Sequence, residues 1–225
     1  MDKVNAAQQP IPNGLIVVFE GVDGVGKTTQ LLLAKDALLS QGWPVYITRN
    51  LGGTPIGEEL RKVMLAPLER PTTTNLYLSV AIQEALVGVI EAERAKGQLI
   101  FMDRGPLSLA AYEIYGGQLN ETLGWQHVDA GMQQLKPELT IIYTADVKTA
   151  LQRARRKSRP ADYFESKPPG FFERVAHGYA TAAERYPYEI ITIDANQPIE
   201  TVHGQTLRAI QQALDKKSGA ALRAA

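Results

Sequence analysis

Residues 15–30 read LIVVFEGVDGVGKTTQ and contain the pattern that decides the fold of this chain. The apolar run at 15–20 predicts a buried strand, and a helical pattern begins at Lys27. Between them, residues 21–28 match G-x-x-x-x-G-K-S/T at every fixed position, in the strand-to-helix context that the motif requires. Such a loop turns its backbone N–H groups toward phosphate oxygens, next to the positive end of a helix dipole. The stretch therefore predicts a phosphate-binding loop.

Individual residues of this loop have different predicted roles. Lys27 is expected to place its ammonium on the β- and γ-phosphates of ATP, and the Thr28 hydroxyl is expected to bind Mg²⁺. The alternative is a glycine turn that binds nothing, which the complete motif and its flanking elements disfavour. The predicted ATP-binding residues are Gly21, Val22, Asp23, Gly24, Val25, Gly26, Lys27, Thr28 and Thr29.

Short β-rich runs alternate with longer helical patterns along the rest of the chain. Most of the runs are continuously apolar, which predicts strands buried on both faces of a parallel sheet. The alternation predicts an α/β fold with a five-stranded, doubly wound parallel sheet and helices on both faces. The expected strands span 15–20, 45–48, 99–102, 139–144 and 189–193, and the expected helices span 27–40, 56–65, 74–96, 107–115, 126–135, 147–157, 170–185 and 199–216.

Length and composition indicate one globular domain, expected at 15–215, with flexible segments at 1–14 and 216–225. The 24 basic and 24 acidic side chains balance, so no global charge favours nucleic acid or a membrane surface as a partner. No window is judged apolar enough over about 18 residues to predict a membrane span. The absence of cysteine excludes disulfides and thiolate metal sites and is consistent with a cytoplasmic protein.

Polar residues follow three of the predicted strands, at the edge where doubly wound folds bind ligands. Asp103 ends the third strand, and its carboxylate could hold Mg²⁺ through water or accept a proton. Arg104 follows it and can bind a phosphate in bidentate fashion. Arg49 ends the second strand and could do the same, although either arginine could instead form a surface ion pair. Two arginines there predict an acceptor that carries its own phosphate.

A dense basic run lies further along the chain, at the end of a predicted helix and the start of a proline-containing loop. In isolation, such a run is more often a solvated basic helix end. Beside a phosphate loop it predicts a lid, at about 153–170, that supplies arginines to a transferring phosphoryl group. The members of the run are Arg153, Arg155, Arg156, Lys157 and Arg159.

These segments together resemble the thymidylate kinase family, of the bacterial type with lid arginines. The resemblance covers about residues 15–210 and rests on FEGVDGVGKTTQ at 19–30, TRNLGGTPIGEELRKVML at 48–65, DRGPLSLAAYE at 103–113 and FFERVAHGYATAAERYP at 171–187. It implies a P-loop nucleoside monophosphate kinase that transfers a phosphoryl group from ATP to dTMP, with Mg²⁺ as cofactor. It also implies a five-stranded parallel core and a homodimer.

The resemblance implies roles for residues around the acceptor as well. Asp23 would bind the 3′-hydroxyl of the deoxyribose, and Tyr112 would abut the sugar where a 2′-hydroxyl would clash. Arg49 and Arg104 would hold the acceptor's phosphate, while Asp103 would serve the metal or the proton. The residues expected to take part in catalysis are Lys27, Asp103, Arg104, Arg153, Arg155, Arg156 and Arg159.

The base-reading positions depart from the family's pattern. An arginine that reads thymine aligns with Ile82, which Gln83 follows, and a polar base contact aligns with Leu109. We expect packing by Tyr77, Leu78 and Ile82, with any contact that Gln83 can reach, to replace hydrogen bonds. This predicts a poor KM for dTMP or weak discrimination between dTMP and dUMP. Two alternatives stay open: a related kinase for another deoxynucleotide or a nucleoside, and a P-loop module that binds ATP without catalysis.

The remaining candidates are interpreted as structural. The three histidines lack metal-ligand spacing, and Arg61 is expected on a solvated helix face. Gly88 interrupts a helical pattern and is a candidate for close helix packing at a dimer face.

Overall fold

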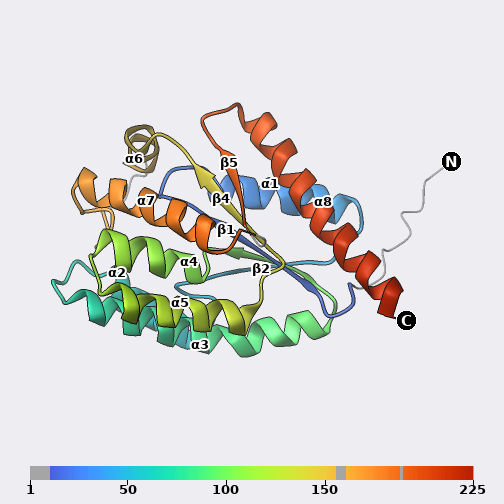
Figure 1. Ribbon diagram of the computed structural model, residues 1–225, viewed down its shortest axis with the longest axis horizontal. Coiled ribbons are helices and arrows are strands. Elements are labelled where there is room, and N and C mark those ends of the chain that lie inside the picture. Colours follow the sequence, from blue (N-terminus) through green and yellow to red (C-terminus); the bar gives the residue numbers. More distant parts are fainter. Residues whose placement is uncertain (1–10, 156–160, 188–189, 225) are drawn as a thin grey trace.

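The predicted parallel sheet is confirmed in a computed structural model of the chain, which describes residues 11–155, 161–187 and 190–224 (Figure 1). The strands lie in the order β2-β3-β1-β4-β5, and every neighbouring pair is parallel. This order places β1 at the centre, so the loop after β1 emerges in the middle of the carboxyl edge. The strands are β1 (Leu15–Glu20), β2 (Val45–Arg49), β3 (Leu99–Asp103), β4 (Leu139–Thr144) and β5 (Ile190–Asp194).

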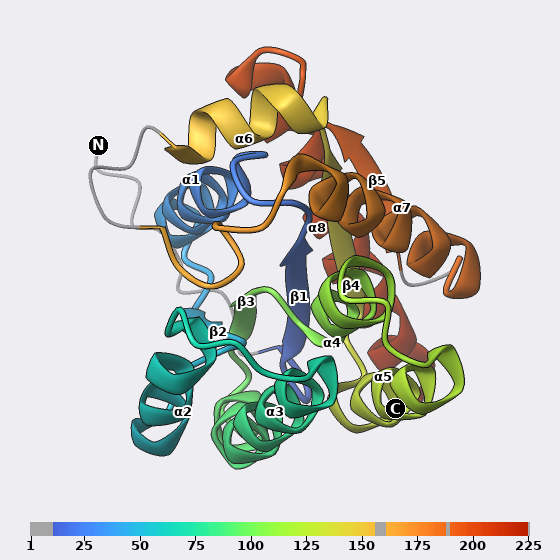
Figure 2. The same ribbon diagram turned by 90° about the vertical axis from the view of Figure 1, so that its left-hand side faces the viewer.

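Helices cover both faces of this sheet, as a doubly wound fold requires (Figures 1 and 2). The first and last helices pack together on one face, and the long central helices lie on the other. One helix changes from α to π geometry immediately after β3. The helices are α1 (Lys27–Ser40), α2 (Pro55–Leu65), α3 (Thr72–Ala95), α4 (Pro106–Leu109), the π-helix η1 (Ala110–Gly116), α5 (Glu121–Leu135), α6 (Val147–Arg155), α7 (Pro169–Arg185) and α8 (Ile199–Ala224).

The central strand explains why its sequence is apolar without interruption. Successive side chains of a strand point to opposite faces. Ile16 and Val18 of β1 pack in one cluster with Leu86 of α3, whereas Val17 belongs to the larger cluster that contains Leu31 of α1. Because both faces of β1 are covered, all six of its residues are buried.

Three boundaries differ from the sequence-based expectation by more than two residues. Ile11 is buried and its backbone N–H bonds to the α3–β3 connection, so ordered structure begins before residue 15. Helix α8 continues to Ala224 instead of ending at residue 216, in keeping with the high helix propensity of its alanine-rich end. Helix α5 begins five residues early because the Asn120 side chain caps it, accepting a bond from the Leu123 N–H at 3.0 Å.

The expectation that no segment is apolar enough to span a membrane is corrected by helix α3. By length and composition alone it is apolar enough to cross a membrane, with a mean hydropathy of 1.2 over the most apolar window. A core helix of a globular protein meets the same criterion. Here Leu86 and Ile90 of α3 pack on the sheet, so the apolar character of α3 has a structural explanation.

Candidate active site

The loop after β1 has the backbone that its glycines predict. Gly24 has φ +85°, and a Cβ there would lie 1.9 Å from the carbonyl oxygen of Ala150 in α6. Gly26 has φ +101°, and a Cβ there would meet no protein atom within 4 Å. Gly24 therefore permits close packing of the loop against α6. Gly26 leaves open space at the N-terminus of α1, where an anion is favourable.

Two cavities meet at this loop. One, here called the α8 cavity, has about 430 Å³ and is lined by the loop together with residues of α6 and α8. The other, the β3 cavity, has about 220 Å³ and is lined by the ends of β2 and β3 and by α3, α4 and η1. Asp23, Lys27 and Thr28 line both. A ligand in one cavity would therefore meet a ligand in the other at these three side chains.

Seven of the nine predicted ATP-binding residues, from Asp23 to Thr29, line the α8 cavity. The other two, Gly21 and Val22, line neither cavity and act through their carbonyl oxygens. Gly21 O accepts a hydrogen bond from Arg104, and Val22 O accepts one from Lys27.

Lys27 is the buried cation of the loop. Its side chain is 6% exposed, and Nζ donates to Val22 O at 3.1 Å. Burial and the nearby Arg104 charge lower the pKa of Lys27 to about 8, against the opposing charges of Asp23 and Asp103. An anionic phosphate in the loop would favour the charged ammonium, so ligand binding and protonation of Lys27 should reinforce each other.

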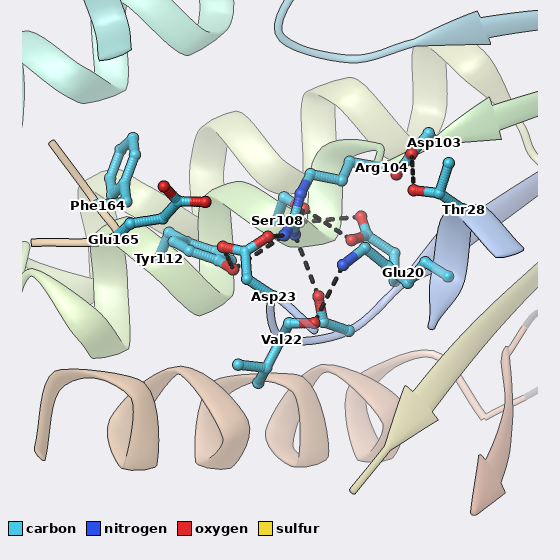
Figure 3. Close-up of polar contacts among 12 residues, drawn as sticks. Glu20, Val22, Asp23, Thr28, Asp103, Arg104, Ser108, Tyr112, Phe164 and Glu165 are labelled. Carbon is cyan, nitrogen blue, oxygen red and sulfur yellow. Dashed lines mark hydrogen bonds and ion pairs between the residues drawn. The ribbon is translucent and has the colours of Figure 1, made fainter. Parts of the chain in front are cut away.

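Thr28 and Asp103, the predicted metal ligands, lie together. Thr28 Oγ1 donates to Asp103 Oδ2 at 2.8 Å (Figure 3). Within the described ranges, no group of three His, Asp or Glu side chains could hold a metal ion by itself. One hydroxyl and one carboxylate nevertheless suit Mg²⁺, which is usually bound by one or two carboxylates together with water and substrate phosphates.

Arg104 joins the loop to η1. It has φ +69°, a left-handed backbone conformation that is unusual for a side chain of this size. Its Nη2 donates to Asp23 Oδ1 at 2.7 Å and to the Tyr112 hydroxyl at 2.9 Å, and that hydroxyl donates to Asp23 Oδ2 (Figure 3). Burial alone would raise the pKa of Asp23. The charges of Arg104 and Lys27 outweigh burial and hold the pKa of Asp23 well below its usual range.

Behind Arg104 lies Glu20, which was predicted only as the last residue of a strand. Glu20 is fully buried and accepts four hydrogen bonds, from the N–H groups of Gly105 and Ser108 and from the hydroxyls of Ser108 and Tyr179. Both hydroxyls also accept hydrogen bonds from Arg104 Nη1. An acidic residue at the end of an apolar strand was the only sequence signal for this network.

Arg49 combines the two interpretations offered for it. It forms an ion pair with Glu58 at 2.6 Å, half exposed, and it also lines the β3 cavity. The interpretation of Arg61 as a solvated surface residue is wrong. Arg61 lines the same cavity, and its Nη1 donates to Leu51 O at 2.7 Å. The cavity thus has more cationic groups than the strand ends alone predicted.

The expected packing residues of α3 are not in the site. Ile82 is completely buried, Tyr77 is 58% exposed, and neither lines the cavities of the described chain. Gln83, which was expected to reach the base, lines the β3 cavity together with Ser79. These two residues are four apart and share one helix face, whereas Ile82 is turned away from the cavity. Leu109 lies in the cavity, as the sequence predicted.

The π-helix η1 contributes two adjacent residues to the β3 cavity, Tyr112 and Glu113. The Tyr112 ring packs edge-on against Phe164, which also lines the cavity. Glu113 is 2% exposed and was not among the predicted site residues. π-Helical turns are frequent at functional sites, but no sequence pattern predicted this one.

The predicted lid is only partly described. Arg153 lines the α8 cavity, and its Nη1 lies 3.5 Å from Ala195 O. Arg155 is the last residue of α6. Three predicted lid residues, Arg156, Lys157 and Arg159, lie outside the described residues.

Comparison with known proteins identifies similar chains. The thymidylate kinase family model matches residues 19–206. Thymidylate kinase of Alkalilimnicola ehrlichii is 36% identical over 89% of this chain and 92% of its own length. Thymidylate kinase of Pelotomaculum thermopropionicum is 34% identical over 90% and 95%, respectively. A crystal structure of thymidylate kinase from Ehrlichia chaffeensis is 26% identical, covers 89% of this chain and 99% of its own, and superimposes with a TM-score of 0.69.

Proposed function

We infer the roles of the site residues from the fact that this chain belongs to the thymidylate kinase family. The protein is a nucleoside monophosphate kinase that transfers the γ-phosphoryl group of ATP to dTMP and releases dTDP and ADP. The observation that carries the assignment of roles is that two cavities share Asp23, Lys27 and Thr28. ATP in the α8 cavity would end at the point where the β3 cavity begins.

We propose that dTMP occupies the β3 cavity with its phosphate between Arg49 and Arg104. Lys27 would neutralise the γ-phosphate from the other side, so that catalysis consists of positioning and charge stabilisation. Asp23 and Tyr112, which already bond to each other and to Arg104, would bind the deoxyribose. The ion pair of Arg49 with Glu58 would orient the arginine before dTMP arrives.

Mg²⁺ would be held by Thr28 and Asp103, whose oxygens are 2.8 Å apart. When bound, the ion would neutralise charge on the phosphates of ATP. Arg153 lines the α8 cavity, where ATP would bind. It is the member of the basic run at 153–159 that we assign to the transferring phosphoryl group. The same role is proposed from the sequence alone for Arg156, Lys157 and Arg159, which lie outside the described residues.

A panel of acceptors tests the proposed division of the site. We expect the wild type to phosphorylate dTMP with ATP and to leave thymidine unchanged, because thymidine lacks the phosphate that the arginines bind. Arg49→Ala should raise KM for dTMP by about tenfold, the equivalent of about 1.4 kcal/mol, with KM for ATP unchanged. Glu59→Gln, on the exposed face of the neighbouring helix α2, is the control and should change neither constant. Equal effects of Arg49→Ala on both substrates would contradict the placement of dTMP.

We also propose a cytoplasmic homodimer formed through the free face of α3. Tyr77 on this face is 58% exposed, and a Cβ on Gly88 would meet no atom within 4 Å of the same chain. Gly88→Glu would therefore leave the subunit intact and place a charge in the interface. Sedimentation analysis should find a dimer for the wild type and for Gly204→Glu on α8, and a monomer for Gly88→Glu. A monomeric wild type would refute the proposal.

A further inference from the structure

Glu113 is a buried acid in the β3 cavity with no role in the functions assigned above. Neutral side chains line the same cavity, among them Ser79, Gln83 and Leu109. Lys27 lies where the two cavities meet, whereas Glu113 lines the β3 cavity alone. A nucleotide with its phosphate among the cations would therefore have its base near Glu113.

The hydrogen bonds around Glu113 define which of its atoms is free. Arg70 Nε donates to Asn75 Oδ1 at 2.5 Å, so the amide oxygen of Asn75 is occupied. The hydrogen bond with Asn75 lowers the pKa of Glu113, which is the effect of donation, so Asn75 gives this bond from its NH₂ group. Arg70 is itself held by backbone carbonyls of the α2–α3 connection and by its contact with the Tyr163 ring, 3.9 Å from the centroid. One Glu113 oxygen is thus committed as an acceptor, and the other is available to the cavity.

Burial keeps the Glu113 carboxyl protonated at neutral pH. Desolvation raises the pKa of Glu113 to about 8, although the Asn75 hydrogen bond and the charges of Arg70 and Lys167 oppose the rise. The other charged or titratable groups on the surrounding elements have partners of their own. Arg104 and Asp23 pair with each other. Arg174 of α7 bonds to the Tyr115 and Gly116 carbonyls, and His127 of α5 bonds to Leu123 O. Asp162 and Glu165 line the same cavity and bond to backbone N–H groups of their own loop.

We propose that Glu113 is a specificity-determining residue whose neutral carboxyl donates a hydrogen bond to the carbonyl oxygen at position 4 of the acceptor's pyrimidine ring. With the carbonyl oxygen of Glu113 accepting from Asn75, its hydroxyl is the group presented to the base. Thymine and uracil have an acceptor at this position, whereas cytosine has an amino donor. A buried donor left facing another donor is strongly disfavoured. Glu113 therefore selects keto pyrimidines and does not distinguish dTMP from dUMP.

This proposal rests on dTMP as the acceptor, and titration calorimetry of dTMP without ATP tests it. For a group with pKa about 8, the protonated fraction falls about tenfold between about pH 7 and pH 9, so Kd for dTMP should rise about tenfold over that interval. Glu113→Gln also offers one acceptor and one donor, but it does not titrate. The titration of Lys27 affects both proteins alike, so the ratio of the wild-type Kd to the variant Kd should rise by about tenfold over the same interval. For dCMP, both proteins should bind at least about tenfold more weakly than dTMP near pH 7.

The outcomes separate this proposal from the proposed function. A wild type that phosphorylates dTMP but binds it with a Kd independent of pH, or with the same pH dependence as Glu113→Gln, overturns the role of Glu113 alone. A wild type that neither binds nor phosphorylates dTMP overturns both. Infrared difference spectra of the wild type provide a readout that needs no variant. A protonated-carboxyl band that shifts when dTMP binds, but not when ATP binds, supports the proposal, and the absence of such a shift refutes it.

Discussion

Glu20→Gln is the perturbation that tests the network behind Arg104 most directly. Glu20 Oε2 accepts from Ser108 Oγ at 2.7 Å and from the Tyr179 hydroxyl at 2.9 Å. Each hydroxyl has a single hydrogen, which it gives to Glu20 while accepting from Arg104. An amide NH₂ at this position would face two groups that need an acceptor. If the amide were flipped, its NH₂ would face the N–H groups of Gly105 and Ser108 instead.

The expected cost follows from the number of bonds lost. A buried polar group left without its hydrogen bond costs about 1–3 kcal/mol, so the two hydroxyls predict a loss of unfolding free energy on the order of 3 kcal/mol. Arg104 also loses its fixed orientation. We therefore expect kcat/KM for dTMP to fall by about tenfold to a hundredfold, equivalent to about 1.4–2.8 kcal/mol, with KM for ATP unchanged.

Urea titration and steady-state kinetics at saturating ATP measure the two effects. Tyr179→Phe removes one of the two hydroxyls and should show roughly half the loss of stability. Glu59→Gln removes an exposed carboxylate that pairs with Lys62 and should change stability by less than about 0.5 kcal/mol. The reasoning is refuted if Glu20→Gln unfolds like the wild type and keeps kcat/KM for dTMP within about threefold.

Three further changes probe the loop and the buried acid. Lys27→Ala should lower kcat by more than about tenfold, or 1.4 kcal/mol, because the γ-phosphate loses its buried cation; single-turnover kinetics with normal rates would contradict this. Gly24→Ala should weaken ATP binding and lower the melting temperature, because the added Cβ would lie 1.9 Å from Ala150 O and because position 24 has φ +85°. An unchanged melting temperature and ATP affinity would show that the loop can relax. The free energy of unfolding should fall by up to about 1.4 kcal/mol per pH unit between about pH 5 and 8, because the folded protein keeps on Glu113 a proton that the unfolded chain releases. Glu113→Gln should remove this decline in urea titrations. Parallel curves of stability against pH for the two proteins would disprove it.

Features that depend on local backbone geometry or on strand order could be predicted from the residues. The glycines and Lys27 of the loop follow β1 directly, and their positions require only a strand, a tight turn and a helix N-terminus. Arg49 and Asp103 lie at equivalent ends of neighbouring parallel strands, where their Cα positions pair in register. Parallel topology alone brings such ends to one edge, so the sequence was sufficient for this half of the site.

The base side of the site was decided by tertiary structure. Ile82 and Gln83 are neighbours in sequence, but a helix turns by about 100° per residue, so one is buried and the other lines the cavity. The π geometry of η1 brings Glu113 into the same wall, and the sequence has no pattern for that turn. Glu20 meets Tyr179 across 159 positions of the chain. Sequence by itself determined the fold and the phosphate chemistry, because these rest on local geometry and strand order. Helix rotation and contacts between distant segments, which exist only in the folded chain, decided which side chains face the base.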